Sequence, residues 1–230
     1  MIIASVNIGG PQPNPYKETA ATGIGKRPVH GRVGVRAPGP KDGGLGSGLV
    51  GDFIGDTASH GGDEQAVYAF AREDLDAWEQ RLGRDLPNGF FGENLTTSGI
   101  DVNDARLGER WRIGPAGFPG ADDAGVELEI TSPRIPCSTF RGWIGEPGWL
   151  KMFTRVARPG AYLRVIEPGT VGQGDVITVT RHPEHDVTIS LAYRATTTER
   201  NLLPRLLEAG DDLDEELRGL VVARGGFDLF

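Results

Sequence analysis

The only cysteine of this chain lies in a segment that could support chemistry at its thiol. Cys137 ends the run Pro133-Arg-Ile-Pro-Cys137. The two prolines fix φ and remove two amide donors, so the segment cannot continue a sheet as an interior strand, and we expect the thiol just past a strand end. Arg134 could lower the pKa of the thiol and offer a forked set of donors to an anion. A buried structural cysteine is the alternative that these residues leave open.

Three other polar residues lie next to or near glycines in the sequence. Lys26 follows Gly25, His60 precedes Gly61 and Gly62, and Asn94 belongs to the turn FGENL. Glycine has no Cβ and tolerates positive φ, so the backbone after His60 can approach a ligand closely. Asn94 could reach a ligand or cap its own backbone. From the residues alone, each of the three could equally be structural.

Two short motifs are not assigned a function. Residues 46–51 match the expression GxGxxG but lack the preceding strand and following helix of a dinucleotide-binding unit. His182 and His185 have a spacing that suits a metal, yet a proline separates them and no further ligands accompany the pair. A loop and a surface turn are the better interpretations.

Composition limits the partners and the compartment. The formal net charge of −8 argues against nucleic acid as the main partner, because phosphate contacts dominate such binding. One cysteine excludes an intramolecular disulfide and suits a reducing compartment. No apolar run approaches the roughly 20 residues that a bilayer span needs. We therefore expect a soluble, cytoplasmic protein that binds neither nucleic acid nor membrane.

Hydrophobic periodicity predicts a mainly β (α+β) fold. Period-2 alternation or short apolar runs predict strands at 2–8, 29–35, 66–70, 107–113, 126–131, 161–166 and 175–181. Helical spacing predicts helices at 72–82 and 149–156, and residues 114–125 are expected to form a long polar hairpin loop. The strand over 126–131 runs directly into the segment that carries Cys137.

The chain becomes helical after Val187. Thr196-x-x-Glu199 and Asp212-x-x-Glu215 are capping-box patterns, each followed by leucines at helical spacing. We therefore divide the chain into a β domain over 1–184 and a helical extension over 185–230. An extension of this size should pack on the β domain or on a second subunit, and we expect a homodimer.

Six stretches together resemble one known family: TGIGK (22–26), VGD (50–52), HGGDEQAVY (60–68), FGENL (91–95), PRIPC (133–137) and YLRVIEPG (162–169). Their order and spacing resemble the MOSC domain, named for the C-terminal part of molybdenum-cofactor sulfurases. The helical extension resembles the three-helix extension of the stand-alone bacterial, YiiM-type branch.

This resemblance implies a fold and an activity. The fold would be a β-barrel-like domain with short peripheral helices. The cofactor would be the molybdenum cofactor, a metal-bound molybdopterin, with Cys137 as the protein ligand to molybdenum. The activity would be reduction of small N-hydroxylated compounds, such as hydroxylaminopurine-type bases and amidoximes, to amines. A separate flavin or iron–sulfur reductase would supply the electrons.

The resemblance also assigns roles to residues. Lys26, His60 and Cys137 would converge as the catalytic group, with His60 as the proton donor and Lys26 as the alternative donor. The pterin carries a phosphate, for which Arg134, Lys26 and Arg164 are candidate cations. Gly61 and Gly62 would let the backbone approach the cofactor, and Asn94 would hydrogen-bond the cofactor or the substrate.

Two other functions remain open. Cys137 could carry persulfide sulfur, or hold the cofactor for delivery to another protein, without turnover. Alternatively, the chain could be a metal-free thiol protein for detoxification, in which Arg134 activates Cys137. Turnover of electron equivalents separates the reductase from the carrier, and activity in metal-free protein would indicate the third function.

Overall fold

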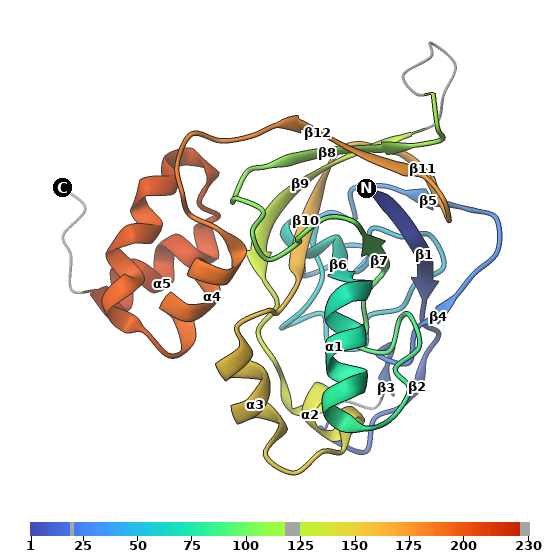
Figure 1. Cartoon of the computed structure of the whole chain (residues 1–230), viewed down its shortest axis with the longest axis horizontal. Coiled ribbons are helices and arrows are strands. Elements are labelled where there is room, and N and C mark those ends of the chain that lie inside the picture. Colours follow the sequence, from blue (N-terminus) through green and yellow to red (C-terminus); the bar gives the residue numbers. More distant parts are fainter. Residues whose placement is uncertain (19–20, 118–124, 226–230) are drawn as a thin grey trace.

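Seven strands close into a mixed β-barrel in the computed structural model, which describes residues 1–18, 21–117 and 125–225 (Figure 1). The strands are β1 (Ile2–Ile8), β6 (Val67–Ala71), β7 (Leu95–Ser98), β8 (Arg110–Gly114), β9 (Val126–Pro133), β10 (Ala161–Glu167) and β12 (Val176–Arg181). Their order is β12-β8-β9-β10-β6-β7-β1, and β1 closes the ring because Ile2 pairs with Val176. Only β6 and β7 run parallel among these neighbours. The barrel confirms the predicted fold class.

Five short strands lie outside the ring. They are β2 (Gln12–Pro13), β3 (Ala21–Thr22), β4 (Arg27–Pro28), β5 (Arg32–Val35) and β11 (Gly169–Gly172). The strand predicted over 29–35 is confirmed for 32–35 but not for 29–31, because Gly31 adopts φ 83° and breaks the extended backbone. β4 pairs with β1, whereas β5 pairs with β11. Part of the hairpin loop predicted at 114–125 lies outside the described residues.

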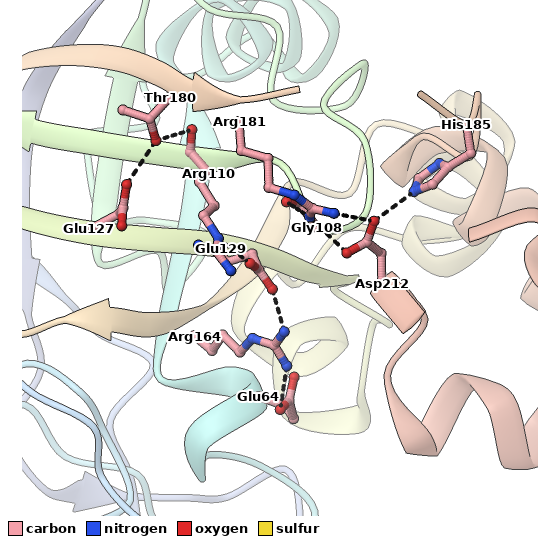
Figure 2. Close-up of polar contacts among 10 residues, drawn as sticks. All are labelled: Glu64, Gly108, Arg110, Glu127, Glu129, Arg164, Thr180, Arg181, His185 and Asp212. Atoms are coloured by element: carbon pink, nitrogen blue, oxygen red, sulfur yellow. Dashed lines mark hydrogen bonds and ion pairs between the residues drawn. The ribbon is translucent and has the colours of Figure 1, made fainter. Parts of the chain in front are cut away.

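The predicted alternation is confirmed along β9. Val126, Leu128 and Ile130 are buried in the barrel core. Glu129 breaks the simple pattern, because it is also buried, at 2% exposed. Its carboxylate pairs with Arg110 of β8 and with Arg164 of β10 (Figure 2). Two arginines from the flanking strands therefore neutralise the buried charge.

Three helices lie together at one end of the barrel, near the short strands β2 and β3 (Figure 1). They are α1 (Arg72–Leu82), α2 (Ser138–Ile144) and α3 (Trp149–Val156). Their buried aromatic side chains form one layer, in which the Trp78 and Trp149 ring centroids lie 4.6 Å apart and those of Phe140 and Phe153 lie 5.2 Å apart. This layer fixes α2, the one helix here that the sequence pattern did not predict.

The helical extension contains α4 (Ile189–Thr197), the 3-10 segment η2 (Arg200–Asp212) and α5 (Glu215–Gly225). Neither predicted capping box is correct. Thr188 caps α4 by accepting from the Leu191 amide at 3.2 Å, whereas Thr196 lies in the last turn of α4. Asp214 caps α5 by accepting from the Leu217 amide at 2.9 Å. None of the described helices is long and apolar enough to cross a bilayer.

Asp212 instead joins the extension to the barrel (Figure 2). Arg181 of β12 donates to both Asp212 oxygens at 2.7 and 2.9 Å, and His185 Nε2 lies 3.4 Å from the same carboxylate. His182 pairs with Glu109 at 2.8 Å. The two histidines thus pair with separate acids, and the described residues contain no cluster of three or more metal-ligating side chains. The extension shares the barrel's hydrophobic core, so the division at residue 184 stays a prediction.

Candidate active site

Cys137 lies in the short connection from β9 to α2. β9 ends at Pro133, which still pairs with Ala161 of β10, and Cys137 is the N-cap residue of α2. Its sulfur accepts from the Phe140 amide at 3.5 Å. The thiol therefore lies four residues past a strand end, as the two prolines predict, and at the start of a helix that they do not predict.

Arg134 is buried beside this thiol. It is 6% exposed, and its guanidinium lies 3.8 Å from the Phe140 ring centroid and 5.8 Å from that of Tyr68. Its Nη1 atom has no hydrogen-bond partner among the described residues. A buried donor without a partner is costly in a ligand-free protein, because it has lost its hydrogen bond to water and gained none in return. Such a donor is suited to bind an anionic ligand group.

The surroundings of Cys137 favour the thiolate. Burial raises the pKa of this thiol, but a hydrogen bond from His60, the charge of Arg134 and the Phe140 amide outweigh burial and lower the pKa to about 6. The thiolate is the form that ligates metals and attacks electrophiles.

This lowered pKa gives a prediction for the cofactor-free protein. Because the thiolate reacts and the thiol does not, the rate of Cys137 alkylation by iodoacetamide should reach half its maximum near pH 6, and His60→Ala should move that midpoint upward. Thiolate absorbance near 240 nm provides a second readout of the same titration. A wild-type midpoint near the ordinary value of 9.0 would contradict the described environment.

Lys26 forms a buried ion pair with Asp52. The two side chains are 8% and 1% exposed, respectively. The Asp52 carboxylate also accepts from the Gly9 amide at 2.9 Å, the Ser47 hydroxyl at 2.7 Å and the Asn94 amide at 2.9 Å. Asp52 is thus a hub that fixes Lys26 and Asn94 relative to each other.

Asn94 uses its side chain within the fold. Its Oδ1 accepts from the Tyr68 amide at 3.1 Å, and its Nδ2 donates to Asp52 and to the Asn7 carbonyl. The structure therefore favours the backbone-capping role for Asn94, although the residue also borders the pocket. Its contact with a ligand stays a prediction.

These groups surround one pocket with about 780 Å³ of empty space, part of it open to solvent. The structure brings six of the eight predicted site residues to its wall: Lys26, His60, Gly61, Asn94, Arg134 and Cys137. The other two lie elsewhere. Arg164 pairs with Glu129 and Glu64 (Figure 2). Gly62 lies against Lys41. The assignment of Arg164 as a phosphate ligand is thus corrected, because two carboxylates already hold it.

Several wall residues were not predicted. Asp52 and Gln65 lie within stretches that resemble the family, so the sequence could have indicated that they border the site. Nothing in the sequence indicated which residues they contact. Lys17 and Asp56 form an ion pair in the pocket wall, and no local pattern links them. Tyr68 and Tyr162 contribute aromatic surface, with ring centroids 5.4 Å apart.

The barrel is closed and mixed, and it carries one thiol past the end of a strand, beside a buried arginine. This fold and this site agree with the family that the comparison identifies. The family model of the MOSC domain matches residues 56–178, and the chain belongs to the MOSC domain family. This match confirms the resemblance found in the sequence. MOSC domains are associated in general with binding of a molybdenum cofactor.

The chain is also similar to three known proteins. It is 29% identical to the uncharacterised protein YflK of Bacillus subtilis over 193 residues, covering 84% of this chain and 79% of that protein. It is 29% identical over 163 residues to a protein of Gibberella moniliformis named reductase, covering 68% of this chain but only 27% of that longer protein. The crystal structure of YiiM from Geobacillus stearothermophilus matches with a TM-score of 0.74 at 24% identity, over 97% of this chain and 98% of that one.

Proposed function

We propose that this chain is a molybdenum-cofactor-dependent reductase that converts small N-hydroxylated compounds, such as hydroxylaminopurine-type bases and amidoximes, to amines. The observation that carries the proposal is the pairing of an activated thiol with an unpaired buried guanidinium donor in one pocket wall. Family membership and the fungal relative named reductase add support.

The residues present fit the cofactor. A soft thiolate is a suitable donor for molybdenum, and Cys137 would provide it. The unused Nη1 of Arg134 would bind an anionic oxygen of the cofactor, which removes the cost of leaving that donor unpaired. When bound, the cofactor supplies the two electrons that reduction requires.

His60 is the better proton donor of the two candidates. The reaction R–NHOH + 2e⁻ + 2H⁺ → R–NH₂ + H₂O breaks one N–O bond, and the departing oxygen leaves as water. His60 hydrogen-bonds Cys137, so its ring lies beside the thiol that would hold the metal. Lys26 is already paired with buried Asp52. His60 would therefore protonate the departing oxygen, and Lys26 would hold the adjacent wall in place.

The pocket wall also suits a flat substrate. Phe53 and Tyr162 border the pocket and are only partly buried, so their rings can offer apolar surface to a planar substrate. A separate flavin or iron–sulfur reductase would deliver the two electrons that each turnover consumes.

The same observations favour one alternative. A thiol with a pKa near 6 could carry a persulfide sulfur, or hold the cofactor for transfer, without reducing a substrate. Such a carrier would bind cofactor or sulfur in stoichiometric amounts and would not consume electrons repeatedly.

Turnover separates the two functions. Molybdenum-loaded protein, supplied with reduced methyl viologen and 6-hydroxylaminopurine or benzamidoxime, should oxidise many equivalents of the dye and release the aminopurine or the amidine, respectively. His60→Ala should lower kcat by about 10²-fold or more if His60 supplies the proton. Asp63→Asn, on the exposed side of the following turn, is the matched control and should leave kcat unchanged. Consumption of no more than about two electrons per protein, the amount that a single reduction of bound cofactor or persulfide requires, would support the carrier and reject the reductase.

A further inference from the structure

An acceptor atom in the pocket wall has no partner. The short 3-10 helix η1 (Asp63–Gln65) ends at Gln65, which borders the pocket together with Tyr68, Arg134 and Cys137. Within the part of the chain that the structure describes, Gln65 Oε1 is buried and accepts no hydrogen bond. Buried polar atoms in folded proteins are nearly always paired, and an unpaired one costs free energy. An unpaired acceptor in a pocket wall points to a ligand that donates to it.

The backbone around Gln65 is held from several sides. The Gln65 amide donates to the Gly62 carbonyl at 3.0 Å, and the Glu64 carbonyl accepts from the Thr131 hydroxyl at 2.6 Å. The Glu64 carboxylate also pairs with Arg164, which continues to Glu129 in the barrel wall (Figure 2). η1 is therefore anchored to β9 and β10. This anchoring gives Arg164 a positioning role in place of the ligand role that the sequence suggested.

Among the described residues that border the pocket, one buried side-chain donor and one buried side-chain acceptor are thus unpaired. The donor is Arg134 Nη1, and the acceptor is Gln65 Oε1. A ligand that satisfies the acceptor must carry its own donor. Among N-hydroxylated compounds, an amidoxime carries an amino N–H on the carbon beside the N–O group, whereas an aldoxime of nearly the same shape has only C–H at that position. The amino group of a bound pterin is the other N–H source of the same chemistry.

We propose that Gln65 is a specificity-determining residue that accepts a hydrogen bond from an N–H group of the bound ligand. This inference rests on the proposed function and deepens it, because it names the substrates that the site selects: those with an N–H beside the reacting N–O group. A site built to accept such a hydrogen bond discriminates against an analogue without the donor, because the acceptor then stays buried and unpaired.

The test compares two substrates on the molybdenum-loaded full chain. The ratio of kcat/KM for benzamidoxime to that for benzaldoxime is measured for wild type, Gln65→Met, Gln65→Glu and the control Asp63→Asn, together with the pterin content of each. If the substrate supplies the N–H, Gln65→Met lowers the ratio by about tenfold through loss of benzamidoxime activity. If the cofactor supplies it, Gln65→Met lowers the pterin content instead. Gln65→Glu keeps an acceptor oxygen and should retain the wild-type behaviour in both readouts.

A third readout does not depend on turnover. If Gln65 Oε1 is unpaired in the ligand-free protein, Gln65→Met should leave the melting temperature of the cofactor-free protein unchanged or raise it. A lowered melting temperature would assign Gln65 a structural role and overturn the proposal, as would a Gln65→Met protein with wild-type substrate ratio and pterin content. If loaded wild type reduces neither compound, the proposed function fails, whereas the assignment of Gln65 is still decided by pterin content.

Discussion

Asp52→Asn should lower the free energy of unfolding by about 3 kcal/mol or more in cofactor-free protein. The reason is that Lys26 and Asp52 are both almost fully buried, so the substitution leaves an ammonium group without its counter-ion in a place that water barely reaches. The carboxylate also accepts from Ser47, Asn94 and the Gly9 amide, and the new side-chain amide cannot accept at both of its ends. Urea denaturation measures the effect.

Two control substitutions test whether the loss comes from the buried ion pair. Lys26→Met leaves Asp52 with its three other donors, so it should cost less than Asp52→Asn, and the double variant should be more stable than the sum of the two losses predicts. The more exposed pair Lys17 and Asp56 borders the same pocket, and Lys17→Met should cost clearly less than either single substitution at the buried pair. Equal losses for the buried and the exposed pair would contradict the role of Asp52 as a hub.

Arg134→Met should reduce retention of the molybdenum cofactor by about 10²-fold or more, because a desolvated, charge-assisted contact to an anion is lost. Methionine is apolar, long and flexible enough to replace the stem of Arg134 against Phe140. The substitution also removes Nη1, a donor that no described residue uses. The cofactor-free variant should therefore stay folded. Its Cys137 thiol should have a higher pKa than in wild type, because the charge of Arg134 lowers that pKa.

Arg141→Met provides the matched control. Arg141 lies on α2, four residues after Cys137, and its side chain is exposed. Loss of the same charge at this exposed position should leave pterin content and the thiol titration as they are in wild type. If Arg134→Met retains as much pterin as Arg141→Met, then Arg134 does not bind the cofactor.

Local sequence patterns predicted most of the framework around Cys137. The alternation along β9 and the two prolines after it placed the thiol beyond a strand end, because side-chain period and proline geometry act within a few residues. The convergence of Lys26 and His60 on Cys137 came from the family resemblance, since the three residues are far apart in the sequence. Periodicity alone does not bring such residues together.

Two of the errors share a physical cause, which is competition by a distant partner. Arg164 was predicted as a candidate ligand for a phosphate, but it forms ion pairs with Glu129 and Glu64, which lie on other elements. Asp212 matched a capping box, yet Arg181 of the barrel binds its carboxylate and Asp214 caps the helix. The hydrogen bonds of Asp52 could not be predicted from local patterns either, because its donors come from separate segments of the chain. Partners of this kind become identifiable only when the tertiary pairing is known.

The most direct test of the central claim is the molybdenum content of protein co-expressed with cofactor biosynthesis. Elemental mass spectrometry, together with the fluorescence of the oxidised pterin, should find nearly stoichiometric molybdenum and pterin in wild type and should find the metal lost from Cys137→Ala. That result would establish Cys137 as the ligand that the proposed reductase requires. If wild type holds no molybdenum under conditions that load a known molybdoenzyme, the cofactor assignment is contradicted, and the thiol of Cys137 must act without the metal.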